Sequence, residues 1–442
     1  MAERVRAGVA AVRVLRDRGV RYAFGVPGES FLGLLDALHE TPEIRLVATR
    51  HEGGAAFMAD AVGKLTGQPA ICMGTRGVGS ANLAVGIHTA QQDSTPLIAL
   101  VGQVETPFRH REALQEVELA AFLGQIAKWA VEPPNGAELP RLVSEAYRRS
   151  VSGRPGPVAI ALRGDILDEE VTADLSTATV RAVSAPQCEA VLASLSLLRD
   201  AKRPLIIAGG GLLRSGAYGD LVAFAGLTGI PVMGAFRRLD VFPGDHPLSL
   251  GSLSFGTPAA MVERARVADV VLAIGTRLAE LTTLGYTVPG PGAKLIHIDV
   301  SPEETGRSFP ATIAIAADAR EALRVFLHAE QAKRRRALVI LDEAQNLSGD
   351  AVEELRMLAD IGADSTPAIQ MILAGQPELA SRLTQPEFAS FAQRIGFSDR
   401  TGTLSADDTA AYIEHRTRVA GASRSIFEQR ACRAIHRHTK GN

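Results

Sequence analysis

The sequence predicts an α/β protein with two doubly wound parallel-sheet domains, followed by a third, shorter α/β segment that ends in helices. Two observations predict this. Short apolar runs such as PAICMG (69–74), PLIALVG (96–102) and GPVAIAL (156–162) alternate with helix-length segments, a pattern typical of a parallel sheet covered on both faces. A polar interval then separates this unit from a second alternating unit, which indicates a domain boundary.

The first domain is expected over residues 1–170. Its predicted elements, in order, are a helix at 3–16, a strand at 21–26, a helix at 30–39, a strand at 44–49 and a helix at 52–65, followed by the three apolar strands already named. Residues 165–186 are polar and irregular, and we interpret them as the linker between domains.

The second domain is expected over residues 186–328, where strands are predicted in RPLIIAGGG (203–211), ADVVLAIGTRL (268–278) and AKLIHIDVSP (293–302). The basic run at 333–336 marks a change of composition. A third segment, 333–442, follows, with strands in ALVIL (337–341) and AIQMILAG (368–375), a helix at 349–360 and a mostly helical end.

Composition excludes several classes of protein. The net charge is −2, which argues against a globally basic nucleic-acid binder. The three cysteines, Cys72, Cys188 and Cys432, lie far apart without metal-ligand spacing, so we expect no metal site among them and a reducing compartment. The N-terminus lacks the apolar core of a signal peptide, and no apolar run is long enough for a bilayer. We therefore expect a cytoplasmic protein without a membrane segment and without nucleic acid.

Three segments follow predicted strands of the first domain: GVPGES (25–30), RHEGGAA (50–56) and TRGVGSAN (75–82). The carboxyl ends of parallel strands form the edge where open sheets bind ligands. We expect these segments to be loops that converge on one rim, with Gly77 and Gly79 permitting tight turns and close backbone approach. Glu52 has two interpretations: a carboxylate facing this rim, or an acid that stabilises a helix start.

These segments, together with ALQEVELAAFLGQIAKWA (113–130), resemble the pyrimidine-binding domain of thiamine-diphosphate-dependent enzymes of the acetolactate synthase type, through about residue 165. Residues 186–328 resemble the central domain of that family. The resemblance implies that Glu52 is the catalytic glutamate that hydrogen-bonds N1′ of the aminopyrimidine, and that Gln115 lies near the active centre. It places further residues next to the cofactor: Gly25, Val26, Pro27, Gly28, Gly77 and Gly79.

Other residues near these motifs receive structural interpretations. We expect His51 to be structural. Asn82 could cap its helix or face the site, and capping or packing is favoured. The triplet 209–211 could be a phosphate-facing turn, but a tight strand-to-helix turn is favoured; Asp299 is a polar anchor or, as favoured, a turn residue. Flavin-containing relatives carry an acidic segment where this chain has GTRLAELTTLGY (275–286). FAD is therefore not expected as a cofactor.

The chain lacks the motif with which this family holds diphosphate and Mg²⁺. No Gly-Asp-Gly triplet occurs in it. Instead, residues 333–442 resemble the part of an AAA+ ATPase from its Walker B strand onward, of the secretion and transposition-helper type. The resemblance implies that Asp342 and Glu343 are the Walker B acids, that Gln376 senses a γ-phosphate, and that Arg394 is a finger or sensor. No G-x-x-x-x-G-K-[ST] loop is present, so ATP binding is expected to be very weak.

By resemblance, the expected reaction is decarboxylation of a 2-oxo acid such as pyruvate, with carboligation. The expected assembly is a homodimer or tetramer through the pyrimidine-binding domain. Without a diphosphate-binding domain, thiamine diphosphate is expected to bind weakly or only with a partner, and the role of Mg²⁺ stays open. Two alternatives remain: a non-catalytic or regulatory fusion protein, and an ATPase-related protein that acts through residues 333–442.

Overall fold

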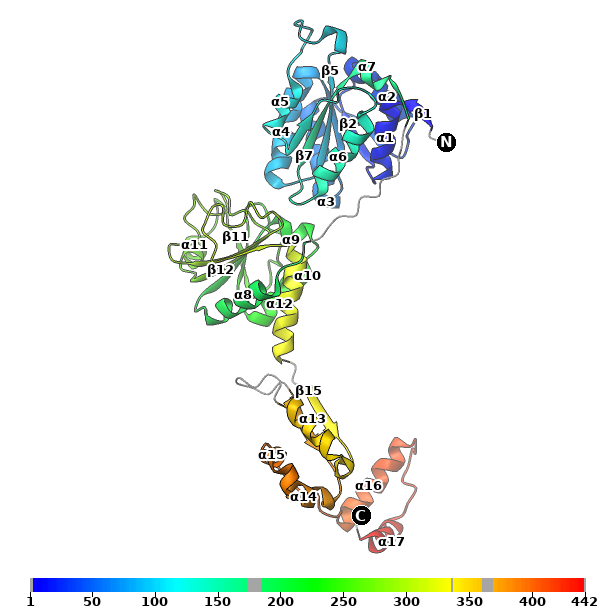
Figure 1. Cartoon of the computed structure of the whole chain (residues 1–442), viewed down its shortest axis with the longest axis vertical. Helices are drawn as coiled ribbons and strands as arrows, with labels where there is room; N and C mark the ends of the chain where they lie inside the picture. The colour runs from blue at the N-terminus through cyan, green and yellow to red at the C-terminus, as the bar shows by residue number, and fades with distance from the viewer. Residues whose placement is uncertain (1–2, 173–183, 335–336, 360–368, 441–442) are drawn as a thin grey trace. The chain divides into compact units, whose positions relative to one another are not determined.

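A computed structural model describes all residues except 1–2, 173–183, 335–336, 360–368 and 441–442. The chain divides into two compact units, Met1–Ala332 and Lys333–Asn442. The first unit holds two parallel six-stranded sheets and the second a parallel two-stranded sheet. The predicted α/β class with two parallel-sheet domains is confirmed (Figure 1).

The N-terminal domain is built on a parallel sheet with the strand order β3-β2-β4-β5-β7-β6. Its strands are β2 (Tyr22–Gly25), β3 (Arg45–Ala48), β4 (Ile71–Thr75), β5 (Leu97–Gln103), β6 (Trp129–Val131) and β7 (Pro157–Arg163). Its main helices are α1 (Ala7–Asp17), α2 (Leu32–His39), α3 (Glu52–Thr66), α4 (Arg76–Asp93), α5 (Leu119–Gly124) and α6 (Leu139–Val151).

Helices cover both faces of this sheet. Along β5, Ile98 and Leu100 pack with α1, α2 and α6, whereas Leu97, Ala99 and Val101 pack with α3, α4 and α5. Side chains of a strand alternate between its faces, so a strand buried on both sides must be apolar throughout. This explains why the strands appear in the sequence as continuous apolar runs.

The predicted irregular linker is wrong at its beginning. Residues Gly164–Leu167 form helix α7, and Glu170–Thr172 form strand β8, which pairs antiparallel with β1 (Arg4–Arg6). The β-branched residues of EVT suit a strand, and backbone pairing with β1 satisfies its polar groups. Residues 173–183 of the predicted linker lie outside the described residues.

The central domain has the strand order β11-β10-β9-β12-β13-β14. Its strands are β9 (Pro204–Ala208), β10 (Val232–Gly234), β11 (Ser249–Ser252), β12 (Val270–Ile274), β13 (Lys294–Asp299) and β14 (Ile313–Ala316). Its helices are α8 (Cys188–Asp200), α9 (Gly210–Arg214), α10 (Tyr218–Thr228), α11 (Ala259–Arg266) and α12 (Ala319–Arg334). Apolar clusters again lie on both faces of the sheet.

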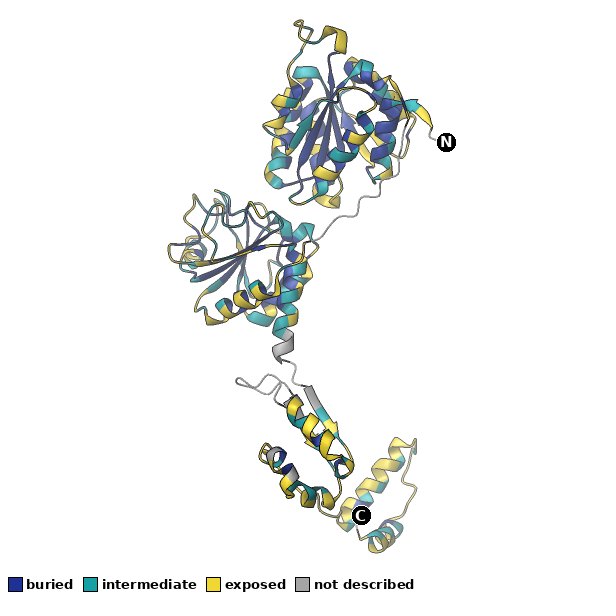
Figure 2. Cartoon of the chain, viewed as in Figure 1, coloured by how far each residue is buried: buried dark blue, intermediate teal, exposed yellow. Residues whose placement is uncertain are grey.

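The second unit, called the tail below (residues 333–442), contains strands β15 (Ala337–Leu341) and β16 (Ile369–Leu373). Its helices are α13 (Gly349–Ala359), α14 (Pro377–Leu383), α15 (Ala389–Ala392), α16 (Ala406–Val419) and α17 (Gln429–Thr439). Its described apolar cluster is small and is centred on Val352, Phe388 and Phe391. Exposed residues are frequent on its helices (Figure 2).

Candidate functional site

The sheet order of the N-terminal domain brings the predicted rim together. Strands β3, β2 and β4 are neighbours and run parallel. Their carboxyl ends therefore meet at one edge, where the loop 26–28, the start of α3 and the start of α4 follow them. This edge of an open parallel sheet is the expected place for a ligand.

Glu52 is the first residue of α3 and is only 9% exposed. The preceding residue, His51, is the N-cap, and its Nδ1 accepts a hydrogen bond from the backbone N–H of Gly53 at 3.0 Å. The imidazole is thus used to cap the helix. Because the amides of a helix start are partly positive, they stabilise the Glu52 carboxylate at this place.

Asn82 contacts Glu52 directly. Its Nδ2 donates a hydrogen bond to Oε2 of Glu52 at 2.9 Å. The favoured interpretation, in which Asn82 caps its helix, is therefore wrong, because the residue lies in the second turn of α4. The other interpretation agrees with the structure, since the side chain bonds to Glu52 on the neighbouring helix. A methyl group placed at Gly79 would lie 3.5 Å from Oε1 of Glu52, so glycine leaves room beside this second oxygen.

Gly77 and Gly79 lie in the first turns of α4 instead of in a loop. The expected tight turn is thus wrong at these positions, because packing of α4 against α3 extends the helix through the glycines. The expected close approach is present. A methyl group at Gly79 would lie 2.8 Å from the carbonyl carbon of Gly74, and one at Gly77 would lie 3.0 Å from the carbonyl oxygen of Gln115.

Gln115 lies next to this helix start in the loop that follows β5. Its backbone carbonyl accepts a hydrogen bond from Gly77 N at 3.0 Å, and its φ of +61° is left-handed. Such a conformation is costly for a residue with a side chain and persists only where contacts hold it. Arg109 supplies some of them through an ion pair with Glu116 at 2.6 Å.

The loop after β2 lies over the end of β4. A methyl group at Gly25 would lie 2.9 Å from Cβ of Met73, and one at Gly28 would lie 2.9 Å from Cβ of Thr75. The hydroxyls of Ser30 and Thr75 are 2.5 Å apart. Glycine is thus required at both ends of the segment that also contains Val26 and Pro27. This segment, Glu52, Gly77, Gly79 and Gln115 share one edge of the sheet.

The two helices that carry Glu52 and Asn82 also carry exposed apolar residues. Helices α3 and α4 pack against each other, with Gly86 so close to Ala56 that a methyl group there would lie 2.4 Å from the Ala56 Cβ. Each helix presents apolar side chains at helical spacing on its exposed side: Phe57, Met58 and Leu65 on α3, and Val78 and Val85 on α4. We call this set the α3/α4 face. Such a face on a folded domain is typical of a protein interface.

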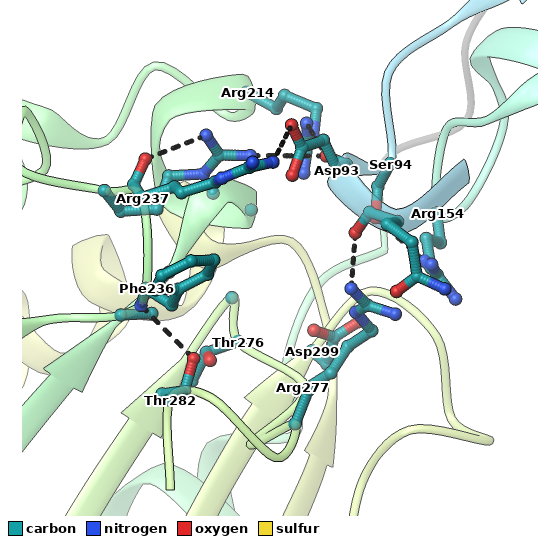
Figure 3. Close-up of a pocket in the computed structure, with 18 of the residues that line it drawn as sticks. Asp93, Ser94, Arg154, Arg214, Phe236, Arg237, Thr276, Arg277, Thr282 and Asp299 are labelled. Carbon is teal, nitrogen blue, oxygen red and sulfur yellow. Dashed lines mark hydrogen bonds and ion pairs between the residues drawn. The ribbon is translucent and has the colours of Figure 1, made fainter. Parts of the chain in front are cut away.

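A cavity of about 610 Å³ lies away from Glu52, at the carboxyl edge of the central sheet (Figure 3). Gly209–Gly211 after β9, Gly275–Arg277 after β12 and Asp299 at the end of β13 line it, together with the end of α4 and Arg154. The glycine triplet forms the expected turn, with Gly209 as N-cap of α9. Asp299 accepts a hydrogen bond from Ser301 N at 2.9 Å, also as expected of a turn.

Arginines concentrate around this cavity and bind the carbonyls at the end of α4. Arg214 and Arg238 donate to the carbonyl oxygen of Asp93 at 3.1 and 3.3 Å, and Arg277 donates to that of Gln92. Arg154 donates to the carbonyl oxygen of Gln91 at 2.8 Å. Cations at a helix C-terminus complement its partial negative charge.

The cavity lining carries both signs of charge, because four acids lie among its arginines: Asp93, Glu280, Asp299 and Asp318. Burial, together with the nearby Arg238, lowers the pKa of Arg214 to about 10. A desolvated guanidinium gains from a nearby anion, and Asp299 and Asp93 supply such charges beside Arg214. Sequence reasoning missed these residues. The available signal was arginines placed within a few residues of glycines that follow central-domain strands, at Arg214 and Arg277.

Asp342 and Glu343 of the tail directly follow β15, and both are exposed. Their role as Walker B acids stays a prediction. Glu343 has a left-handed φ of +53° and accepts a hydrogen bond from Nε2 of Gln345, whose Oε1 accepts from Gln376 N at 3.0 Å. Among the described residues, no group of three or more His, Cys, Asp or Glu side chains is arranged to hold a metal ion.

Comparison with known families gives three matches. Residues 5–122 match the thiamine pyrophosphate enzyme N-terminal TPP binding domain, and residues 191–326 match the central domain of thiamine pyrophosphate enzymes. Residues 275–383 match an AAA domain. This third match begins before the tail and overlaps the central-domain match, although the structure places β13 and β14 in the central sheet.

No helix within the described part of the chain has the length and apolar character needed to cross a membrane.

The chain is similar to acetolactate synthases of several organisms. The chain is 31% identical over 351 residues to the acetolactate synthase large subunit of Corynebacterium glutamicum, covering 78% of this chain and 56% of that protein. It is 35% identical over 329 residues to the probable acetolactate synthase large subunit of Methanocaldococcus jannaschii, covering 72% and 55%. For isozyme 3 of Escherichia coli, the identity is 32% over 323 residues, covering 72% and 56%.

The chain therefore spans about half the length of the relatives that it matches. Within that half, the order of the two matched domains agrees with the two parallel-sheet domains of the structure. The chain carries the N-terminal and central domains of the thiamine pyrophosphate enzyme family and is a homologue of acetolactate synthase large subunits.

Proposed function

We propose that this chain provides the pyrimidine side of a thiamine-diphosphate site, and that a partner chain supplies the grip on diphosphate and Mg²⁺. One observation carries the proposal. Glu52 is buried at the carboxyl edge of the sheet, with Oε2 held by Asn82 and Oε1 directed beside Gly79. A carboxylate placed in this way is suited to hydrogen-bond one nitrogen of an aminopyrimidine ring.

The residues present fit the pyrimidine half of the cofactor. Glycines at 25, 28, 77 and 79 lie where added side chains would collide with neighbouring groups, so the rim stays free of side chains at these positions. When bound, thiamine diphosphate supplies a nucleophilic thiazolium carbon. Glu52 would hold a proton at ring N1′, while Val26, Pro27 and Gln115 would border the ring.

The proposed reaction is decarboxylation and carboligation of a 2-oxo acid such as pyruvate, as in the acetolactate synthases that the chain resembles. The proposed partner docks on the α3/α4 face, because Glu52 begins α3 and Asn82 lies on α4 beside Val78 and Val85. An apolar face on the helices that carry the carboxylate is what a site shared between two chains needs. A second copy could dock through this face in a homodimer or tetramer, but it lacks the Gly-Asp-Gly motif as well. The partner that supplies the grip on diphosphate and Mg²⁺ is therefore proposed to be a full-length relative.

Cofactor binding by the chain alone gives the first test. Isothermal titration of the purified protein with thiamine diphosphate and Mg²⁺ is expected to show no micromolar binding, because no Gly-Asp-Gly motif is present. Micromolar binding by the homomer would show that the described residues are sufficient and would overturn the need for a partner.

Complementation gives the second test. A full-length acetolactate synthase large subunit is made inactive by replacing its own pyrimidine-side glutamate with glutamine. Adding this chain is expected to restore turnover at least about tenfold, since a correctly placed proton-transfer group contributes a factor of roughly 10² or more. The matched control is Glu52→Gln, which keeps the size of the side chain. Equal rescue by both proteins would contradict the role of Glu52.

The same mixing experiment separates the second candidate, a non-catalytic or regulatory subunit. The α3/α4 face supports it, because docking through this face does not need a carboxylate. In that case the chain changes the activity of an intact relative, and Glu52→Gln does so equally well.

The absence of FAD as a cofactor stays a prediction. The acidic segment of flavin-containing relatives is Asp-Asp-Arg, whereas the cavity wall at 275–282 carries Arg277 and Glu280 without such a segment.

A further inference from the structure

The contact between Asn82 and Glu52 joins two helices at the proposed site. Glu52 is the first residue of α3, and Asn82 lies in the second turn of α4. The N–O distance is 2.9 Å. An ionised carboxylate only accepts hydrogen bonds, so Asn82 must present its amide nitrogen to Glu52 and direct its carbonyl oxygen elsewhere. Asn82 is therefore the donor of this hydrogen bond and Glu52 the acceptor.

Helix packing fixes the distance between the two residues. A methyl group at Gly53 would lie 3.3 Å from the carbonyl oxygen of Asn82, and one at Gly86 would lie 2.4 Å from Cβ of Ala56. The backbones of α3 and α4 therefore approach as closely as glycine permits. Asn82 extends a short side chain with few rotamers across this narrow gap, so the amide has little freedom to move away from Glu52.

The hydrogen bond makes the two oxygens of Glu52 unequal. Oε2 accepts from Asn82, whereas Oε1 lies next to Gly79 and receives no hydrogen bond from any residue in the described ranges. A carboxylate attached by one oxygen cannot rotate freely about its terminal bond without losing that bond. Oε1 is therefore the oxygen left to meet a ligand.

The identity of residue 82 is not explained by helix formation or burial. Asparagine is a weak helix former in a helix interior, and residue 82 lies on the exposed side of α4, near the apolar residues Val78, Ala81 and Val85. The hydrogen bond to Glu52 is the side-chain contact that gives asparagine a role at this position.

We propose that Asn82 is a positioning residue for the thiamine reaction, which holds Oε2 of Glu52 so that Oε1 faces N1′ of the aminopyrimidine. The inference rests on the proposed function of Glu52 and adds a residue to it. Asn82 does not touch the reacting atoms, and it acts only through Glu52. Its loss should therefore impair proton removal from bound cofactor more strongly than cofactor binding.

The first measurement concerns the pair in the chain alone. A double-mutant cycle with Asn82→Ala and Glu52→Ala, read by urea unfolding of the purified protein, is expected to show coupling of about tenfold in the unfolding constant, because a hydrogen bond to a charged group is worth that order. Asn135→Ala is the matched control. This change removes a hydrogen bond elsewhere in the domain, which Asn135 Oδ1 accepts from Glu138 N. It should show no coupling to Glu52→Ala.

The second measurement mixes this chain with the full-length acetolactate synthase subunit whose own pyrimidine-side glutamate is replaced by glutamine. Hydrogen–deuterium exchange at C2 of bound thiamine diphosphate, followed by acid quench and NMR, is expected to slow at least about tenfold with Asn82→Ala and with Asn82→Asp. The half-saturating cofactor concentration should change less than about threefold, since Asn82 makes no contact with the cofactor. Asn82→Gln retains the amide donor and should recover part of the exchange rate. Asn135→Ala should leave it unchanged.

The outcomes separate this inference from the proposed function. If the unaltered chain does not restore exchange, the proposed function fails and the inference fails with it. If the unaltered chain restores exchange and Asn82→Ala does so equally, the positioning role alone is overturned. An equal loss of cofactor affinity and exchange rate would also overturn it, because that pattern indicates general damage to the fold.

Discussion

Two carboxylate sites in this molecule follow the end of a parallel strand, and their surroundings differ. Glu52 lies on a six-stranded sheet with helices on both faces, is buried, and is held by Asn82. Glu343 lies after a two-stranded sheet, is exposed, and bonds to the nearby Gln345. We therefore expect chemistry from a short motif only where neighbouring elements enclose it and orient its atoms.

The two sheets should differ most in how much free energy of unfolding is lost when a strand isoleucine is shortened to alanine. Ile98 of β5 is 0% exposed, whereas Ile340 of β15 is 63% exposed. Ile98→Ala is expected to destabilise its domain by about 3 kcal/mol, because it leaves a cavity. Ile340→Ala should cost under about 0.5 kcal/mol, as is usual for exposed sites.

Urea unfolding of the two variants checks this contrast. Comparable losses at both positions would mean that Ile340 is covered in solution, for example by a partner of the tail. The comparison between an enclosed and an open carboxylate site would then no longer hold.

The packing of α3 on α4 can be tested with two glycines. Gly86→Ala places a methyl group 2.4 Å from Cβ of Ala56 and is expected to cost about 1–3 kcal/mol by overpacking. Gly54→Ala meets nothing within 4 Å and should stabilise α3 by about 0.5–1 kcal/mol, because alanine loses less entropy in a helix. Thermal unfolding measures both. A stabilising Gly86→Ala would show that the helices are farther apart than described.

The sequence predicted the sheets better than it predicted the contacts between elements. Alternating apolar runs located the strands, and the helix expected at 52–65 is observed at Glu52–Thr66. The segment 75–82 was expected to be a loop, because two glycines and a serine resemble turn residues, yet tight packing against α3 makes it helical. The arginines on the end of α4 come from both domains, so a local pattern could not predict that they meet.

A smaller effect on thermal stability, which depends on pH, is expected at Asp299 in the wall of the central cavity. Burial raises the pKa of Asp299 above its ordinary value, so the folded chain binds this proton more tightly than the unfolded chain does. Stability contributed by this group is therefore present at low pH and falls as pH rises through the raised pKa. Asp299→Asn should raise Tm at pH 7 by about 2 °C, equivalent to under about 1 kcal/mol, and the gain should vanish below pH 3.8.

A second aspartate of the same domain provides the control of opposite sign. Burial opposes the shift at Asp269, but hydrogen bonds from Lys202 N and Arg203 N hold its pKa below the ordinary value. Stability from this group is present above the ordinary pKa and is lost as pH falls through the lowered one. Asp269→Asn should therefore lower Tm at pH 7. Equal responses of the two variants would contradict this account.

The smallest expected effect is that of ATP on the tail. The sequence contains no glycine-rich loop of the kind whose amides and lysine hold phosphates, so we expect very weak ATP binding beside Asp342 and Glu343. A ligand stabilises a fold only when its concentration approaches Kd, so about 1 mM ATP with Mg²⁺ should leave Tm unchanged. A rise in Tm that Glu343→Gln removes would show that the exposed carboxylates bind the nucleotide. Enclosure by neighbouring elements would then not explain the difference between the Glu52 site and the Glu343 site.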